Sequence, residues 1–153
     1  MTGVQTCALP ISLRVAGRLL HITAVSVGNP HCVVPLARIS PALARRLGPL
    51  LELHALFPQR TNVQLVRVLD AHQIQSEIWE RGAGYTLASG SSSCAAAAAC
   101  VRLGLCQSPL QVRRPGGLLQ VQVASDYSVT LEGPAQKVYA GVAAPADLIP
   151  HFE

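Results

Sequence analysis

Residues 79–99 read WERGAGYTLASGSSSCAAAAA and are the part of the sequence from which the architecture is most readily predicted. An acidic and a basic residue end an apolar run, and two glycines, Gly82 and Gly84, then permit an unusual backbone path. A Ser/Gly loop leads directly into a helix-forming run with five consecutive alanines, Ala95–Ala99. Because its side chains are small, this helix can lie close to neighbouring backbone, and we expect it inside a sheet.

The sequence on both sides of this stretch predicts the rest of an α+β domain in which a sheet wraps a helix. Ser40 followed by Pro41 predicts a helix over Pro41–His54, ended or kinked at Gly48-Pro49. The alanine-rich helix is predicted to end near Gly104. The predicted strands are Leu13–Ile22, Thr23–Val27, Cys32–Leu36, Thr61–Leu69, a strand marked by Ile74, Ile78 and Trp79, Leu110–Arg113, Leu118–Ala124, Ser128–Glu132 and Lys137–Val142.

The composition is that of one globular domain without a membrane span. The chain has 153 residues, of which 50% are apolar and 13% are charged, so it can bury a core. Its longest apolar runs fall short of the ~18 residues that cross a bilayer, which excludes a transmembrane helix. The net charge of +4 comes from scattered arginines without interleaved aromatics. We therefore expect neither a nucleic-acid partner nor a membrane partner.

Five cysteines with no C-x-x-C pair argue against a disulfide framework and against a zinc site, so no metal is expected. Free thiols are typical of a cytoplasmic chain. The first twelve residues, MTGVQTCALPIS, lack the features of a signal peptide and resemble a translated sequencing adapter. We predict that residues 1–12 are a non-native leader, that residues 13–153 form the domain, and that the true N-terminal part is missing.

The start of the alanine-rich helix is a candidate anion site. The first N–H groups of a helix have no intrahelical partner, and the helix dipole there favours negative charge, as on a carboxylate. From composition alone, the simpler interpretation is a buried core helix whose serines serve only as caps.

Several motifs, taken together and in this order, resemble the diaminopimelate epimerase family. They are Gly28-Asn29-Pro30-His31-Cys32-Val33, Phe57-Pro58-Gln59-Arg60-Thr61-Asn62-Val63, Glu80-Arg81-Gly82-Ala83-Gly84-Tyr85-Thr86, Ser89-Gly90-Ser91, Pro115-Gly116-Gly117-Leu118 and Gly133-Pro134-Ala135. The resemblance covers roughly residues 13 to 143. It implies one lobe, the C-terminal one, of a two-lobed fold in which each lobe is a curled, mainly antiparallel sheet around a central helix.

The resemblance also implies an activity and its site. Members of the family epimerise an amino acid without a cofactor, converting LL- to meso-diaminopimelate for lysine and peptidoglycan synthesis in the cytoplasm. One thiol from each lobe moves the α-proton, so this chain needs the missing N-terminal lobe, is inactive alone and is expected to form a homodimer at full length. The implied substrate-binding residues are Asn29, Asn62, Glu80, Arg81, Gly90 and Ser91. The implied acid/base group is Ser89, assisted by His31 and Glu80.

The chain departs from the family pattern at the catalytic position, where Ser89 stands in place of a cysteine. A hydroxyl is a much weaker acid than a thiol and needs a strong neighbouring base. Cys94 is expected to pack as a small apolar residue, Cys32 to face away from His31, and Tyr85 replaces an acidic residue. Two alternatives therefore stay open: a racemase or isomerase of another amino acid or small acid, and a non-catalytic carboxylate-binding paralogue.

Overall fold

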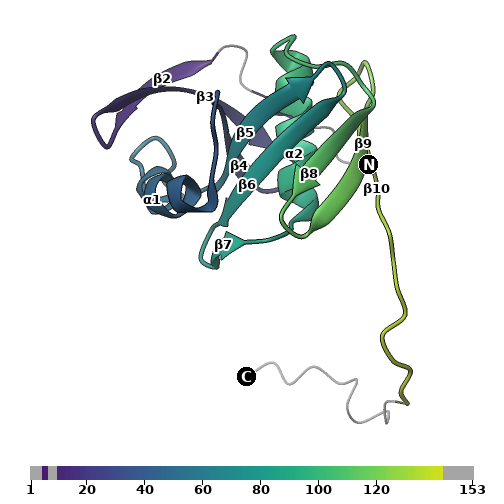
Figure 1. The fold of residues 1–153 in the computed structure, drawn as a ribbon. Coiled ribbons are helices and arrows are strands. Elements are labelled where there is room, and N and C mark those ends of the chain that lie inside the picture. The colour runs from purple at the N-terminus through teal and green to yellow at the C-terminus, as the bar shows by residue number, and fades with distance from the viewer. Residues whose placement is uncertain (1–4, 7–9, 143–153) are drawn as a thin grey trace.

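A computed structural model describes residues 5–6 and 10–142 of the chain. Within these residues, ten strands form one mixed sheet and two α-helices pack against it (Figure 1). The elements are β1 (Gln5–Thr6), β2 (Ile11–Val15), β3 (Arg18–Ser26), β4 (Pro30–Pro35), α1 (Pro41–Glu52), β5 (Asn62–Asp70), β6 (Gln73–Glu80), β7 (Gly84–Thr86), α2 (Gly90–Arg102), β8 (Leu110–Arg114), β9 (Gly117–Val123) and β10 (Val129–Glu132). Neither helix of this described part is long and apolar enough to cross a membrane.

The sheet runs in the order β1-β3-β4-β5-β6-β8-β9-β10, with β2 beside β3 and β7 beside β6. The pairs β4–β5 and β6–β8 are parallel, and the other pairs of neighbours are antiparallel. The expected α+β fold, a mainly antiparallel sheet curled around a central helix, is confirmed.

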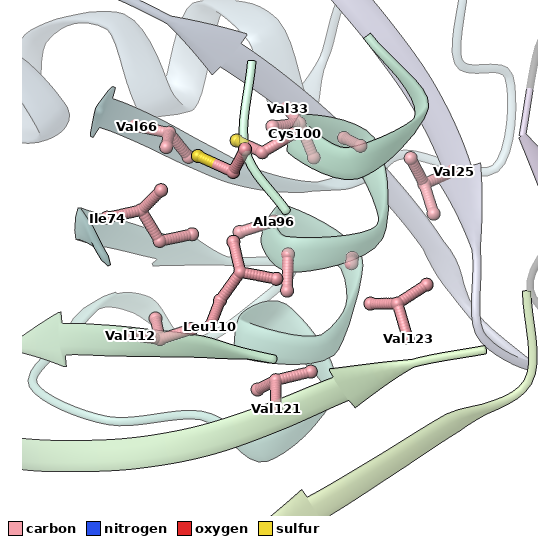
Figure 2. Close-up of a cluster of buried hydrophobic side chains, with 14 residues drawn as sticks. Val25, Val33, Val66, Ile74, Ala96, Cys100, Leu110, Val112, Val121 and Val123 are labelled. Atoms are coloured by element: carbon pink, nitrogen blue, oxygen red, sulfur yellow. The ribbon is translucent and has the colours of Figure 1, made fainter. Parts of the chain in front are cut away.

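Helix α2 is the central helix, and Figure 2 shows valine, isoleucine and leucine side chains of the sheet pointing at it. Ala95–Ala99 are all fully buried, as a helix enclosed on every side requires. The predicted end near Gly104 is confirmed, since Gly104 follows the C-terminus with φ +68°. At the serine-rich start, the side chain of Ser89 caps the N-terminus.

Helix α1 covers the opposite face of the central strands. The side chains of β5 alternate between the two faces of the sheet. Val63 and Leu65 pack in one apolar cluster with residues of α1, whereas Val66 packs in the other with the alanines of α2. Five consecutive β5 residues from Asn62 to Val66 are buried, because both faces of this strand are covered.

The Gly48-Pro49 pair does not end α1, which continues to Glu52. Ser40 caps its N-terminus as predicted, accepting a hydrogen bond from the Leu43 N–H at 3.1 Å. Gly48 is needed for packing, because a Cβ atom there would overlap the Cβ and Cγ atoms of Trp79 on β6. The missing side chain lets the indole lie directly against the helix.

One predicted strand, Lys137–Val142, is wrong. Residues 133–142 form no strand, and Val138, Tyr139 and Val142 are exposed by 89%, 84% and 102%. The run has strand-like residues but no neighbouring strand to pair with, and an unpaired strand is not stable in water. Figure 1 shows this segment leaving the sheet after β10.

The leader prediction for residues 1–12 stays a prediction. Residues 1–4 and 7–9, including Cys7, lie outside the described residues. Gln5–Thr6 pair with β3 as β1, and Ile11 and Ser12 belong to β2.

We predict that Gly48→Ala lowers the free energy of unfolding by about 1–3 kcal/mol, the usual effect of overpacking a core. This loss is expected although alanine is the better helix former by about 1 kcal/mol. Urea unfolding of the 153-residue chain followed by far-UV circular dichroism measures it.

The control for Gly48→Ala is the same substitution in a Trp79→Ala background, where the overlapping Cγ and ring atoms are removed and only the Cβ atom remains. Alanine at position 48 should then cost clearly less than in the wild type, and a double-mutant cycle isolates the contact. An equal loss in both backgrounds would contradict the packing explanation.

Candidate active site

Four chain segments meet at one end of the central strands. In the parallel pair β4–β5, His31 lies opposite Asn62, so the starts of both strands are side by side. In the antiparallel pair β5–β6, Val63 lies opposite Trp79, which places Glu80 and Arg81 beside the start of β5. The fourth segment is the N-terminus of α2, whose first turn is contacted by the side chain of Gln64 on β5.

The side chain of Asn62 holds two of these segments together. Its Nδ2 donates to the Pro30 carbonyl oxygen at 2.9 Å, and its Oδ1 accepts from the Arg81 backbone N–H at 3.0 Å. The Arg81 guanidinium donates to the Gln59 carbonyl oxygen at 3.0 Å. The predicted residue Asn62 is therefore buried and partly occupied, with one amide N–H left for a ligand.

The side chain of His31 is hydrogen-bonded to Asn29 and is 1% exposed. Its Nδ1 accepts from Gln64 Nε2 at 3.0 Å, so in the neutral ring the proton is on Nε2, which donates to Asn29 Oδ1 at 2.9 Å. Burial and, to a smaller extent, the positive charge of Arg81 lower the pKa of His31 to about 4. The ring is therefore neutral at pH 7 and fixes which way the Asn29 amide points.

Gln64 connects this pair to α2, since its Nε2 also donates to the Ser92 hydroxyl at 3.0 Å. The chain of contacts thus runs from Asn29 through His31 and Gln64 to the first turn of the helix. Our sequence analysis missed Gln64. The available signal was a single amide side chain inside the apolar run of β5, facing the same side as His31.

Ser89 serves as the N-cap of α2. Its hydroxyl oxygen accepts from the Ser92 N–H at 3.4 Å and lies 3.5 Å from the Ser91 hydroxyl, while its carbonyl accepts from the Ser93 hydroxyl at 2.8 Å. Among residues 10–142, no carboxylate or imidazole is hydrogen-bonded to the Ser89 hydroxyl.

The first N–H groups of α2 belong to Gly90 and Ser91. Helix geometry leaves them without intrahelical partners, and no other described residue accepts from them. The approach to the helix is fixed from the β8–β9 turn, where the Gly116 N–H donates to the Leu87 carbonyl at 2.8 Å. A Cβ atom at Gly116 would overlap that same carbonyl, which explains the glycine in this motif.

Glu80 lies at the end of β6, and alternation along the strand places it on the face that packs against α2, with Ile78 and Ser76. Two pairs of predicted residues lie beside it, His31 hydrogen-bonded to Asn29 and Asn62 hydrogen-bonded to Arg81. The two pairs form one group through Pro30, the chain neighbour of Asn29 and His31, whose carbonyl oxygen accepts from Asn62. His31 also reaches the first turn of α2 through Gln64, so these predicted residues gather at one end of the sheet.

The thiols take no part in this group. Cys32 lies on the α1 face, opposite to His31 as expected, and burial raises its pKa to about 12. Cys94 is half-buried on α2, and burial raises its pKa as well. Both thiols are therefore protonated at neutral pH and make poor bases.

Two buried carboxylates on the α1 side of the sheet, Glu52 and Glu77, were also missed by our sequence analysis. Glu52, the last residue of α1, accepts hydrogen bonds from the Trp79 indole and from the Gly82 backbone N–H. On the same face, Tyr85 donates to the Glu77 carboxylate at 2.6 Å, and the Arg45 guanidinium lies 4.2 Å from the centre of the Tyr85 ring.

Comparisons with known proteins identify the family of the chain. A family model described as diaminopimelate epimerase matches residues 23–138. The chain is 52% identical over 118 residues to "Diaminopimelate epimerase 2" of Nostoc sp., covering 77% of this chain and 41% of that protein. It is 42% identical over 135 residues to "Diaminopimelate epimerase" of Pseudomonas paraeruginosa, covering 88% of this chain and 49% of that protein.

A solved structure shares the fold. A Bacillus anthracis phenazine biosynthesis protein of the PhzF family matches with a TM-score of 0.52 at 16% identity, over 73% of this chain and 38% of that one. The chain spans about half or less of the length of the curated relatives it matches. With the family model matched over most of its length, the chain belongs to the diaminopimelate epimerase family.

Proposed function

We propose that this chain is the substrate-holding C-terminal lobe of a cofactor-independent amino-acid epimerase that interconverts LL- and meso-diaminopimelate. The observation that carries the proposal is the hydrogen-bonded group around Asn62, which lies on the α2 side of the sheet, where the first N–H groups of that helix are free. Two relatives that match this chain bear the name diaminopimelate epimerase.

Epimerisation moves one proton. A base on one face of the substrate takes the α-proton, the negative charge spreads into the carboxylate, and an acid on the other face returns a proton to the same carbon. The reaction consumes no oxidant or reductant. Hydrogen-bond donors placed where charge develops lower the barrier, and in this proposal the N–H groups of Gly90 and Ser91, with the dipole of α2, take that role.

The polar residues suit an amino acid with carboxylate and ammonium groups. Arg81 supplies a positive charge for a carboxylate, and Glu80 supplies a negative charge for an ammonium group. Asn29 and the free N–H of Asn62 add neutral hydrogen bonds. His31, which is buried and neutral, acts in this proposal by orienting Asn29.

The proposal requires a second lobe that brings the opposing acid/base group and closes the site over the substrate. This chain by itself would bind weakly and turn over nothing, since it supplies groups to one side of the reacting carbon. A homodimer of the complete protein is part of the same expectation.

A second candidate, a non-catalytic carboxylate-binding paralogue, is favoured by the role of Ser89. Its hydroxyl caps the helix and has no base beside it among the described residues, so nothing there makes it a proton acceptor. A racemase or isomerase for another amino acid or small acid would use the same carboxylate-binding groups with a different acid/base partner.

We predict that Ser89→Cys raises the rate of solvent-deuterium incorporation at the substrate α-carbon by about 100-fold or more, the usual contribution of a positioned acid/base group. The complete reading frame is incubated with LL-diaminopimelate in heavy water, and exchange is followed by mass spectrometry. A thiol is a poorer N-cap than a hydroxyl, so the same variant should lose about 1 kcal/mol of stability.

The control is Ser125→Cys, which adds a thiol in an exposed turn between β9 and β10. Exchange in the wild type would support native epimerase activity. Exchange in Ser89→Cys alone would support the binding frame and transfer the native role to the non-catalytic candidate. Exchange in neither, together with no calorimetric binding of either diaminopimelate isomer, would overturn the proposal.

We predict that His31 makes stability depend on pH between about 4 and 6.5. The pKa is lowered from 6.5 to about 4 in the folded chain, so the unfolded chain binds the proton first as the pH falls. The stabilisation is therefore complete above pH 6.5 and declines towards pH 4, by up to about 1.4 kcal/mol per pH unit. Urea unfolding of the wild type and of His31→Gln, followed by the fluorescence of Trp79, isolates this slope as the difference between the two. Equal slopes would show that His31 is not held neutral.

A further inference from the structure

We propose that Glu52 is a positioning residue that sets the geometry of Glu80 and Arg81 from the opposite side of the sheet. The inference deepens the proposed function and rests on it for the identity of the ligand.

A carboxylate at the position of Glu52 is unfavourable unless it has hydrogen-bond partners. It is the last residue of α1, where the helix dipole disfavours a negative charge, and the last turn of this helix has no basic residue. It is also 7% exposed, and carboxylates are seldom buried without partners. Helix formation and solvation therefore both oppose this residue, and its hydrogen bonds have to account for it.

The two oxygens of Glu52 hold the two residues that flank Glu80-Arg81. Oε2 accepts from Trp79 Nε1 at 2.7 Å, and Oε1 accepts from the Gly82 backbone N–H at 3.0 Å. The Glu52 carboxylate thus contacts both the residue before and the residue after the Glu80-Arg81 pair. Hydrogen bonds to a carboxylate are the stronger kind, so these two contacts hold the segment firmly.

The contacts of Glu52 are linked to the proposed substrate-binding residue Asn62 through the backbone of Arg81. Gly82 adopts φ +77°, and the preceding residue, Arg81, donates its own N–H to Asn62 Oδ1 at 3.0 Å. A shift of Gly82 therefore moves the Arg81 amide relative to Asn62. Oε1 of Glu52 also lies 3.8 Å from the guanidinium of Arg60, two residues before Asn62, although this arginine is 59% exposed and its ion pair is weak.

A matched control exists on the same face of β6. Glu77 is also a buried carboxylate, 3% exposed, and it accepts from the Tyr85 hydroxyl at 2.6 Å. It makes no hydrogen bond to residues 80–82 in the described part of the chain. If buried carboxylates on this face only support packing, Glu52→Gln and Glu77→Gln should have the same effect.

The test measures ligand affinity and local geometry for both variants. Glu52→Gln replaces one acceptor oxygen by an N–H donor, so one of the two flanking contacts is lost. We expect calorimetric affinity for meso-diaminopimelate, in the complete protein, to fall about 10-fold, the usual size of the effect when a hydrogen bond to a charged group is lost. Glu77→Gln should leave the affinity within about twofold, although both variants lose stability in urea.

Nuclear magnetic resonance of the ligand-free 153-residue chain supplies a readout that does not depend on the ligand. Trp79 is the one tryptophan of this chain, so its indole N–H signal reports directly on Glu52. Glu52→Gln should shift this signal and the backbone amides of Arg81 and Gly82, whereas Glu77→Gln should leave the Arg81 and Gly82 amides in place.

Several outcomes would overturn the inference. Unchanged affinity in Glu52→Gln, or equal losses in Glu52→Gln and Glu77→Gln, would reduce Glu52 to a packing role. If Glu52→Gln does not fold, Trp79→Phe removes one of the two contacts, keeps an aromatic ring, and should reproduce part of the affinity loss. If the wild type does not bind diaminopimelate, the proposed function fails, and the amide shifts of Arg81 and Gly82 alone decide the role of Glu52.

Discussion

The five alanines at the centre of α2 are completely buried, and this burial limits where every other element can lie. A helix can be enclosed by a sheet only if its side chains are short on every side, because the strands otherwise cannot approach from several directions. Once the sheet has closed around the helix, neither the axis nor the N-terminus of α2 can move independently of the strands. The start of α2 is therefore fixed relative to the starts of β4 and β5, where the polar residues lie.

This enclosure creates a problem of polar burial, which the chain solves with one connected network. His31 and Gln64 face α2 on adjacent strands in otherwise apolar surroundings, and each would be costly there alone. They bond to each other, and the two ends of the pair bond to Asn29 and Ser92. Connected hydrogen bonds of this kind rigidify the groups they join, although the Oε1 atom of Gln64 stays buried without a partner among the described residues. The network thus carries the fixed position of the helix out to a loop residue at the surface.

The opposite face works in a different way. The side chain of Trp79 lies against α1 where Gly48 leaves room, and its indole N–H reaches the carboxylate at the end of that helix. The same carboxylate reaches past the strand to the turn after it. The turn at residues 80–82 is therefore held from two sides, by Asn62 from β5 and by Glu52 from α1.

Much of this arrangement is readable in the sequence, because it is written in local patterns. The cap at Ser40, the glycine after α2 and the apolar alternation of the strands each have a physical cause within a few residues, and the structure has them where they were expected. The segment at 137–142 shows the limit of such patterns, since its residues favour a strand but a strand needs a partner.

Contacts between segments that are distant in the sequence could not be predicted, because local patterns do not report them. Glu52 and Gln64 each owe their roles to residues about 30 positions away, and Gly48, next to a proline, gave a local signal for a helix end. Only the packing of α1 against β6 shows that this glycine makes room for an indole. The grouping of Asn29, Asn62, Glu80 and Arg81 was accessible in advance through the resemblance of the motifs, because no single one of these residues indicates a site by itself.

Ser89 brings the local and the distant constraints together. At this position the helix favours a side chain that accepts a hydrogen bond from its first turn, and serine does this well while cysteine does it poorly. Proton transfer at the same position favours a thiol, which can be ionised near neutral pH beside a helix N-terminus. The two demands favour different side chains at this position. Serine here favours the cap of α2 over proton transfer, and under the proposed function this would leave substrate binding less affected than catalysis.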